Sequence, residues 1–166
     1  MNAPRDLTPH QLKARLAEQG LQAGIAALNA AVPHRYTGVY RLRGDALFNV
    51  VLHDKQGAVR PQELAVVQLG DSFCQFVLRD GSFLVADSGQ EERLDGHRFQ
   101  GVVVAYHGVP VADNAGGLYG TLCHFDLVGH DLPQGQFELL EAAGKMLFPY
   151  VRGLDGDANA HAAAAA

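Results

Sequence analysis

The chain has 166 residues, of which 48% are hydrophobic and 19% are charged, and its formal net charge is −5 at pH 7. This size and composition predict one globular domain with a substantial core and exclude a disordered chain. The 13 lysine and arginine residues are scattered along the chain, so we expect no nucleic-acid partner, because phosphate-binding surfaces gather basic residues.

Neither a membrane span nor an export signal is expected. The apolar runs are all shorter than the roughly 18 residues that suggest a spanning helix. Residues 1–8 lack the charged and then apolar segments of a secretory signal. The two cysteines, Cys74 and Cys123, are too few for a disulfide scaffold. These features favour a cytoplasmic protein without a membrane partner.

The first expected element is one long helix. Thr8 offers an N-cap, and Pro9 suits the first helical position. Gly20 and Gly24 weaken the middle by about 1 kcal/mol each relative to alanine, and Pro33 ends the helix. The apolar residues recur at mostly helical spacing: Leu12, Leu16, Leu21, Ile25, Leu28 and Val32.

The rest of the chain alternates short runs of β-prone residues with turn signals. The expected elements are strands at 35–43 and 46–53, a connector around Pro61, a short helix at 73–78, a strand at 82–86 and a long polar loop at 88–101. Strands at 102–111 and 118–125 follow, and a final helix runs from about 132 to 151.

This order of elements predicts a single α+β domain at residues 8–152, with a flexible start at 1–7 and a disordered tail at 153–166. Strands dominate the middle and helices bracket the ends. We therefore expect a central antiparallel sheet of five or six strands with the N-terminal and C-terminal helices packed on one face. Alternation divides the last strand into two faces: Leu118, Gly120, Leu122 and His124 on one, and Tyr119, Thr121, Cys123 and Phe125 on the other.

Residues 106–126 have the pattern of a β-hairpin with a glycine-rich tip. This hairpin resembles the last hairpin of a GAF domain. Five motifs are similar to that family in order and spacing over residues 28–150: Ser-Phe-Cys at 72–74, Phe-Leu-Val-Ala-Asp at 83–87, Gly-Val-Pro-Val at 108–111, Gly-Thr-Leu-Cys at 120–123 and Leu-Leu at 139–140. The resemblance implies a GAF-like fold of the profilin/PAS-like type, with a pocket between the sheet and the 88–101 loop.

Most GAF domains bind small molecules or join proteins, and few are catalysts. The resemblance therefore implies a non-catalytic sensor or signalling module that is not an enzyme, with no catalytic residue and no metal ligand. Its small-molecule ligand and any cofactor stay unidentified. The expected ligand-binding residues surround the implied pocket: Phe73, Cys74, Asp87, Arg93, His97, Arg98, Tyr106 and Cys123.

The resemblance also implies a homodimer through the terminal helices, as is common in the family. The apolar residues Leu12, Leu16, Leu21 and Ile25 would then be shared between contacts within one chain and contacts between two chains.

Two other functions stay open. The first is a thiol-based enzyme of the free methionine sulfoxide reductase type, in which Cys74 and Cys123 approach within disulfide range. Those enzymes carry a cysteine on the mobile loop, whereas residues 88–101 contain none, which speaks against this alternative. The second is a ligand-free protein-interaction domain whose pocket is filled by Phe and Leu side chains.

Cofactors known from other GAF domains find weak support. Cys123 and His124 are similar to a bilin attachment pair, but neighbours on a strand point to opposite faces. Phe83 and Asp87 match half of a cyclic-nucleotide signature, and the Asn-Lys part is missing. Haem could use His97 or His107, although no zinc-type ligand spacing is present.

Overall fold

The computed structural model of the protein describes residues 7–154. The flexible start predicted at 1–7 and the disordered tail predicted at 153–166 fall almost entirely outside the described residues. Within residues 7–154, no helix is long and apolar enough to cross a membrane.

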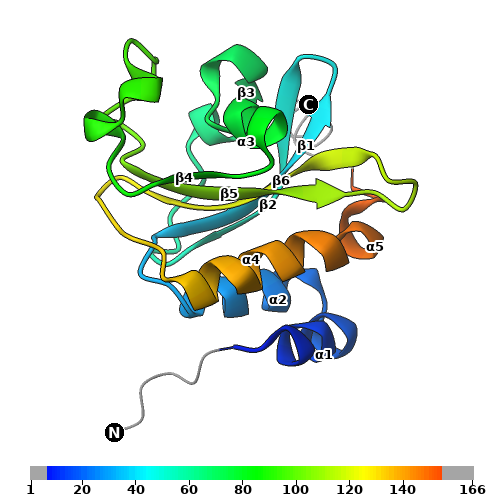
Figure 1. Cartoon of the computed structure of the whole chain (residues 1–166). Helices are drawn as coiled ribbons and strands as arrows, with labels where there is room; N and C mark the ends of the chain where they lie inside the picture. The colour runs from blue at the N-terminus through cyan, green and yellow to red at the C-terminus, as the bar shows by residue number, and fades with distance from the viewer. Residues whose placement is uncertain (1–6, 155–166) are drawn as a thin grey trace, which may run out of the picture.

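A six-stranded antiparallel sheet forms the centre of the molecule (Figure 1). The strands are β1 (Tyr36–Arg43), β2 (Ala46–Asp54), β3 (Val66–Gln68), β4 (Phe83–Val85), β5 (Ala105–Ala112) and β6 (Leu118–Asp126). They lie in the order β3-β2-β1-β6-β5-β4, so an early hairpin and a late hairpin meet where β1 pairs with β6. This arrangement confirms the predicted α+β fold.

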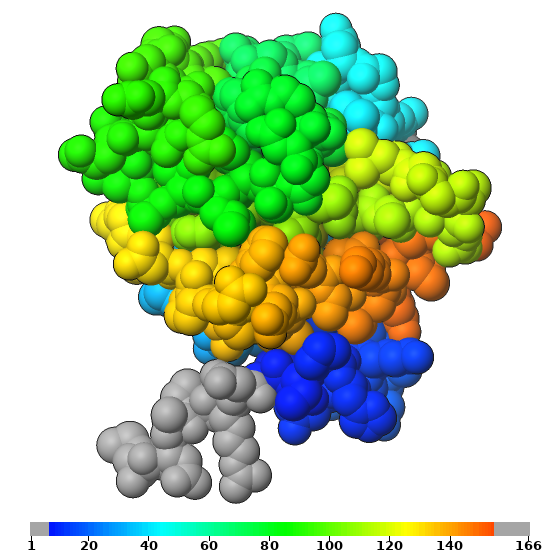
Figure 2. Space-filling model, viewed as in Figure 1, coloured from blue at the N-terminus to red at the C-terminus, as the bar shows by residue number. Residues whose placement is uncertain are grey.

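The helices lie on both faces of the sheet. They are α1 (Pro9–Gln19), α2 (Leu21–Ala30), α3 (Cys74–Asp80), α4 (Gln134–Met146) and α5 (Phe148–Val151). α2 and α4 pack on one face, and α1 packs on these two helices on the side away from the sheet (Figure 1). The segments before and after β4 form one continuous layer over the opposite face (Figure 2, green). The predicted packing of both terminal helices on one face is thus confirmed.

The N-terminal region forms two helices, so the prediction of one long helix is wrong. Gly20 separates α1 from α2 with a φ of 92°, in the left-handed region that favours glycine. The break folds α1 back over the helix layer, where Leu12, Leu16 and Ile25 are fully buried within their own chain. Of the four apolar residues expected to contact a second chain, Leu21 alone is half-buried rather than buried. The homodimer stays a prediction.

The start of α1 confirms the predicted N-cap. The Thr8 side chain accepts a hydrogen bond from the Gln11 backbone N–H, and the Gln11 side chain accepts one from the Thr8 N–H. Each bond satisfies a donor that the helix itself leaves unpaired.

We expect Thr8→Ala to lower the free energy of unfolding by about 1 kcal/mol, because the cap loses its acceptor. Thr8→Ser keeps an oxygen at the same position and serves as the matched control. Urea unfolding of both variants measures the difference. Equal stability of the two variants would show that the cap contributes nothing.

Three other elements differ from the expectations. The connector around Pro61 contains a short edge strand, β3, that pairs with β2. The last helix divides at Leu147, because Pro149 has no N–H to continue the helical hydrogen bonds. A register shift opposite Val111 and Ala112 places Tyr119 on the helix side, although alternation had put it with Cys123 and Phe125.

The two faces of the sheet bury chemically different clusters. The helix side is mainly aliphatic and includes Leu122 and Leu140. The opposite side is rich in aromatic rings and contains both cysteines. Because side chains alternate along β5 and β6, these two strands supply residues to both clusters.

Candidate functional site

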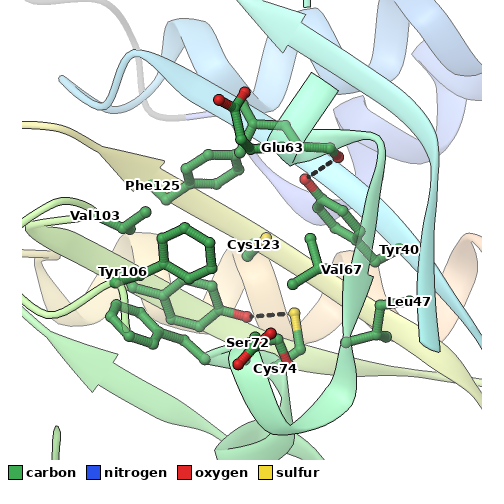
Figure 3. Close-up of a pocket in the computed structure, with 14 residues that line it drawn as sticks. Tyr40, Leu47, Glu63, Val67, Ser72, Cys74, Val103, Tyr106, Cys123 and Phe125 are labelled. Atoms are coloured by element: carbon green, nitrogen blue, oxygen red, sulfur yellow. Dashed lines mark hydrogen bonds between the residues drawn. The ribbon is translucent and has the colours of Figure 1, made fainter. Parts of the chain in front are cut away.

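A cavity lies on the face of the sheet opposite the terminal helices (Figure 3). Its volume is about 60 Å³, which is room for roughly four to six water-sized groups. The lining residues come from β1, β2, β3, β5, β6, the start of α3 and the adjoining segments: Tyr40, Leu47, Glu63, Leu64, Val67, Asp71, Ser72, Phe73, Cys74, Phe99, Val103, Tyr106, Cys123 and Phe125. The presence of this cavity gives no support to the alternative of a filled pocket.

Both cysteines face this cavity as free, buried thiols (Figure 3). Cys74 is the first residue of α3, and Cys123 lies on β6. The Tyr106 hydroxyl lies 3.1 Å from the Cys74 sulfur, and the Thr121 hydroxyl donates to the same sulfur at 3.2 Å. α3 therefore places one thiol directly over the strand that carries the other.

These contacts make the two thiols chemically different. The pKa of Cys74 is lowered, first by the neighbouring Cys123 thiol and then by the Thr121 and Tyr106 hydroxyls, while burial opposes the lowering. The Cys123 thiol itself donates to the Gly38 carbonyl at 3.8 Å. The pKa of Cys123 is raised well above its usual value by the neighbouring Cys74 thiol and by burial. Burial, followed by the neighbouring sulfurs, raises the pKa of Tyr106 well above its usual value. Cys74 is thus the thiol that ionises first, while Cys123 and Tyr106 keep their protons.

We expect Tyr106→Phe to raise the pKa of Cys74, because the variant lacks a hydroxyl that donates to the thiolate. The ultraviolet absorbance of the thiolate, followed against pH, measures this change. Tyr40→Phe is the matched control, since Tyr40 also lines the cavity but donates its hydroxyl to the Leu64 carbonyl. An unchanged titration in Tyr106→Phe would contradict the assignment of Tyr106 as a donor.

Four of the eight residues expected to bind a ligand line the cavity: Phe73, Cys74, Tyr106 and Cys123. The other four, which all come from the polar loop and its start, lie outside it. The Asp87 side chain accepts from the Gly89 N–H, and Arg93 pairs with Glu91.

Arg98 pairs with Asp71, a half-buried residue that lines the cavity, at 3.3 Å. The His97 ring packs against Phe73 with the ring centres 4.8 Å apart. Its Nε2 is buried and has no hydrogen-bond partner within the described part of the chain.

The cavity wall comes from a different segment than expected. The 88–101 loop contributes Phe99 alone, whereas residues 63–74 supply seven of the lining residues. Leu64 and Val67 were not among the expected site residues. The sequence contains one weak indication that this segment lines the cavity. Leu64, Val67 and Leu69 are apolar, although the connector around them looks irregular.

A second group of ionisable side chains lies at the helix side of the sheet. His34 precedes β1, His107 and His124 lie on β5 and β6, and His130 follows β6. The ring centres of the other three lie 5.0, 5.5 and 5.1 Å from that of His34. Nε2 of His34 and Nδ1 of His107 share a hydrogen bond of 2.9 Å. Among residues 7–154, no group of three or more His, Cys, Asp or Glu side chains could hold a metal ion.

Burial keeps three of these histidines, His34, His107 and His124, neutral. It lowers the pKa of His34 to about 3 and that of His107 to about 4, and His107 and His130 lower that of His34 further. The pKa of His124 lies well below its usual value, again mainly because of burial. Asp126 acts in the opposite direction and raises the pKa of His34. His34, His107 and His124 are thus neutral rings whose protonation the fold opposes.

No family model and no curated protein matches the chain, whereas solved structures are similar over most or all of it. The GAF domain of an Acinetobacter phosphoenolpyruvate-protein phosphotransferase is 15% identical, with a TM-score of 0.69 and 100% of both chains covered. The free methionine-R-sulfoxide reductase from Neisseria meningitidis, in complex with its substrate, is 17% identical, with a TM-score of 0.67 over 87% of this chain and 86% of that one. The type II enzyme of the same name from Thermoplasma acidophilum is 17% identical, with a TM-score of 0.64 over 86% and 96%. These structures confirm the predicted GAF fold.

The prediction that the chain is not an enzyme is contradicted by the same comparison. That prediction rested on the rarity of catalysts among GAF domains, yet enzymes of this fold align with most of the chain. It also gave great weight to the missing loop cysteine. The position of Cys74 and Cys123 at one cavity could not be seen from the sequence.

Proposed function

We propose that this chain, which has the fold of a GAF domain, is a thiol-dependent reductase that uses Cys74 and Cys123 to reduce a small oxidised molecule in the cavity. The observation that carries this proposal is the convergence of both thiols on one cavity wall, with hydroxyl donors at the Cys74 sulfur. Similar solved structures include reductases of free methionine-R-sulfoxide, and sulfoxide reduction by two thiols is the same kind of chemistry.

The pKa values assign different roles to the two thiols. Cys74, whose pKa is lowered, is the nucleophile, because the thiolate is the reactive form. Cys123 keeps its proton and resolves the oxidised Cys74. The overall step consumes two thiols and one oxidised substrate, and yields a Cys74–Cys123 disulfide, the reduced substrate and one water molecule. An external dithiol then reduces the disulfide by thiol–disulfide exchange.

This assignment places the second cysteine in the sheet, whereas the free methionine sulfoxide reductases carry a cysteine on the mobile loop. Residues 88–101 contain no cysteine, so no thiol from the loop can resolve the intermediate. Cys123 takes that role from within the sheet. Since Cys74 and Cys123 are the only cysteines of the chain, no third thiol competes with them.

Turnover in the presence of dithiothreitol tests the proposal. The reduced protein is given free methionine-R-sulfoxide in one series and an alkyl hydroperoxide in another, and the reduced products are quantified. We expect catalytic turnover with at least one of the two. Cys74→Ser is expected to lower the rate by at least about 10³-fold, because the nucleophile is lost.

Cys123→Ser provides the matched comparison. It keeps the nucleophile, so we expect one oxidation of Cys74 to a sulfenic acid that dimedone traps, without an internal disulfide. Unchanged turnover in Cys74→Ser, or no reaction of the reduced protein with either substrate, would contradict the proposed function.

A further inference from the structure

We propose that the substrate of the cavity is a compact, uncharged alkyl hydroperoxide, and that Tyr106 passes a proton to the alkoxide that leaves. This inference rests on the proposed function, because it names the substrate class for the same two thiols. Three properties of the cavity support it: its size, the charges of its lining and the surroundings of the Cys74 sulfur.

The size of the cavity favours a short molecule. A volume of about 60 Å³ accommodates roughly four to six water-sized groups. A short branched or linear alkyl hydroperoxide fits this space. Free methionine sulfoxide is longer and branches into an amino-acid group, so it would need the walls formed by Leu64 and Val67 to move.

The charges of the lining favour an uncharged molecule. None of the lining residues in the described part of the chain is a lysine, arginine or histidine, and the two ionisable side chains besides the thiols and tyrosines are Glu63 and Asp71. The carboxylate of a free amino acid would enter without a cationic partner, which costs several kcal/mol when the charge is buried. The Glu63 carboxylate is directed away from the thiols (Figure 3), and Asp71 is paired with Arg98.

The surroundings of the Cys74 sulfur favour attack on a terminal atom. Tyr106 and Thr121 contact this sulfur at 3.1 and 3.2 Å, and Cys123 lines the same cavity. The sulfur of a sulfoxide carries two carbon substituents and would have to enter this crowded space. The outer oxygen of a hydroperoxide carries only a hydrogen and can approach end-on.

The reaction then balances with the groups present. The Cys74 sulfur attacks the outer oxygen, the O–O bond breaks, and Cys74 becomes a sulfenic acid. The proton of the Cys74 thiol ends on the alkoxide, relayed by the Tyr106 hydroxyl, and the product is an alcohol. The Cys123 thiol next attacks the Cys74 sulfur, an S–S bond forms, and the hydroxyl leaves with the Cys123 proton as water. Two thiols have lost two electrons to the peroxide, and an added dithiol restores them.

Rates of disulfide formation under anaerobic conditions test the inference. The reduced full-length protein is mixed with tert-butyl hydroperoxide, cumene hydroperoxide or free methionine-R-sulfoxide, quenched with acid and analysed by mass spectrometry. We expect tert-butyl hydroperoxide to react at least about 100-fold faster than methionine-R-sulfoxide, since the latter buries unpaired charges. We expect cumene hydroperoxide to react more slowly than tert-butyl hydroperoxide, because its phenyl ring exceeds the cavity.

Two neighbouring valines of β3 provide a matched pair of variants. Val67 lines the cavity, whereas Val66 points away from it and is 37% exposed. Val67→Ala enlarges the cavity and should raise the rate with cumene hydroperoxide relative to that with tert-butyl hydroperoxide. Val66→Ala should leave this ratio unchanged. Equal effects of the two substitutions would show that the cavity does not select the substrate.

The outcomes separate the two proposals. A disulfide that forms as fast with methionine-R-sulfoxide as with tert-butyl hydroperoxide would overturn the substrate class and leave the reductase proposal intact. A reduced protein that forms no disulfide with any of the three molecules would overturn both. Tyr106→Phe supplies a further check, with Tyr119→Phe as its control, because Tyr119 lies on the helix side of the sheet and donates its hydroxyl to the Val151 carbonyl. Alcohol release slowed in Tyr106→Phe but not in Tyr119→Phe supports the proton relay, and equal rates in the two would contradict it.

Discussion

Replacing Gly120 by alanine is expected to lower the free energy of unfolding by about 3 kcal/mol. Gly120 lies in β6 between Arg41 of β1 and Val111 of β5. A Cβ atom at this position would lie 1.8 Å from the Tyr40 carbonyl oxygen and 2.8 Å from the Tyr40 carbonyl carbon. The clash is with backbone at the centre of the sheet, so no side-chain rotation can relieve it.

Gly135→Ala is the control for this prediction. Gly135 lies in α4, and a Cβ atom there meets nothing within 4 Å. Alanine should therefore leave stability unchanged or raise it by up to about 1 kcal/mol. Urea unfolding at pH 7 measures both variants. If Gly120→Ala unfolds at the same urea concentration as the unsubstituted protein, the close approach of β1 and β6 described here is incorrect.

Acidification is the second change with a large expected effect, through the histidine cluster. The pKa values of His34, His107 and His124 are lower in the folded protein than the ordinary value of 6.5. The unfolded chain therefore binds more protons below pH 6.5, and stability falls as the pH falls. Between pH 7 and 5.5 the expected loss is about 1 kcal/mol each for His34 and His107, and His124 adds to the loss in the same direction.

The lowered pKa values of the histidines fix the pH range over which stability is lost. The stabilisation is fully present above pH 6.5 and is lost progressively as the pH falls through the range from 6.5 to about 4 for His107 and about 3 for His34. Asp54, whose pKa is lowered to about 2 mainly by its hydrogen bond to Arg35, adds a loss only at lower pH. Lys55 and Asp126 also act on the cluster, in opposite directions at His34.

Urea unfolding over a series of pH values measures this dependence. His107→Gln should reduce the loss between pH 7 and 5.5 by about 1 kcal/mol, because one titrating group is removed. His10→Gln changes an exposed histidine of α1 and should leave the dependence unchanged. A stability that is constant from pH 7 to 5.5 would contradict the buried, neutral state of these rings.

Much of the fold could be predicted because its long strands carry strong local signals. β1 and β2 are rich in aromatic and β-branched residues and are separated by the turn at residues 43–45. β3 could not be predicted, because a strand of three residues depends on pairing with β2 rather than on its own composition. The break between α1 and α2 at Gly20 could not be predicted either. A glycine within a helical pattern indicates a less stable helix, but it does not indicate that the chain turns there.

The site was harder to predict than the fold. Phe73, Cys74, Tyr106 and Cys123 were identified from family-like motifs, but their meeting at one cavity depends on how α3 lies over β5 and β6. The polar loop was misleading, because its charged residues looked like ligand-binding groups. In the structure Arg93 pairs with Glu91 and Arg98 with Asp71, and the cavity is lined by apolar residues such as Leu64 and Val67. The sequence alone does not show whether a charged side chain pairs with another side chain or faces a ligand.

The most direct test of the central claim is peptide mapping by mass spectrometry after the reduced protein has received one equivalent of tert-butyl hydroperoxide. We expect a single disulfide that joins the peptide of Cys74 to the peptide of Cys123, together with one equivalent of alcohol. Recovery of both cysteines as free thiols alongside unconsumed peroxide would contradict it.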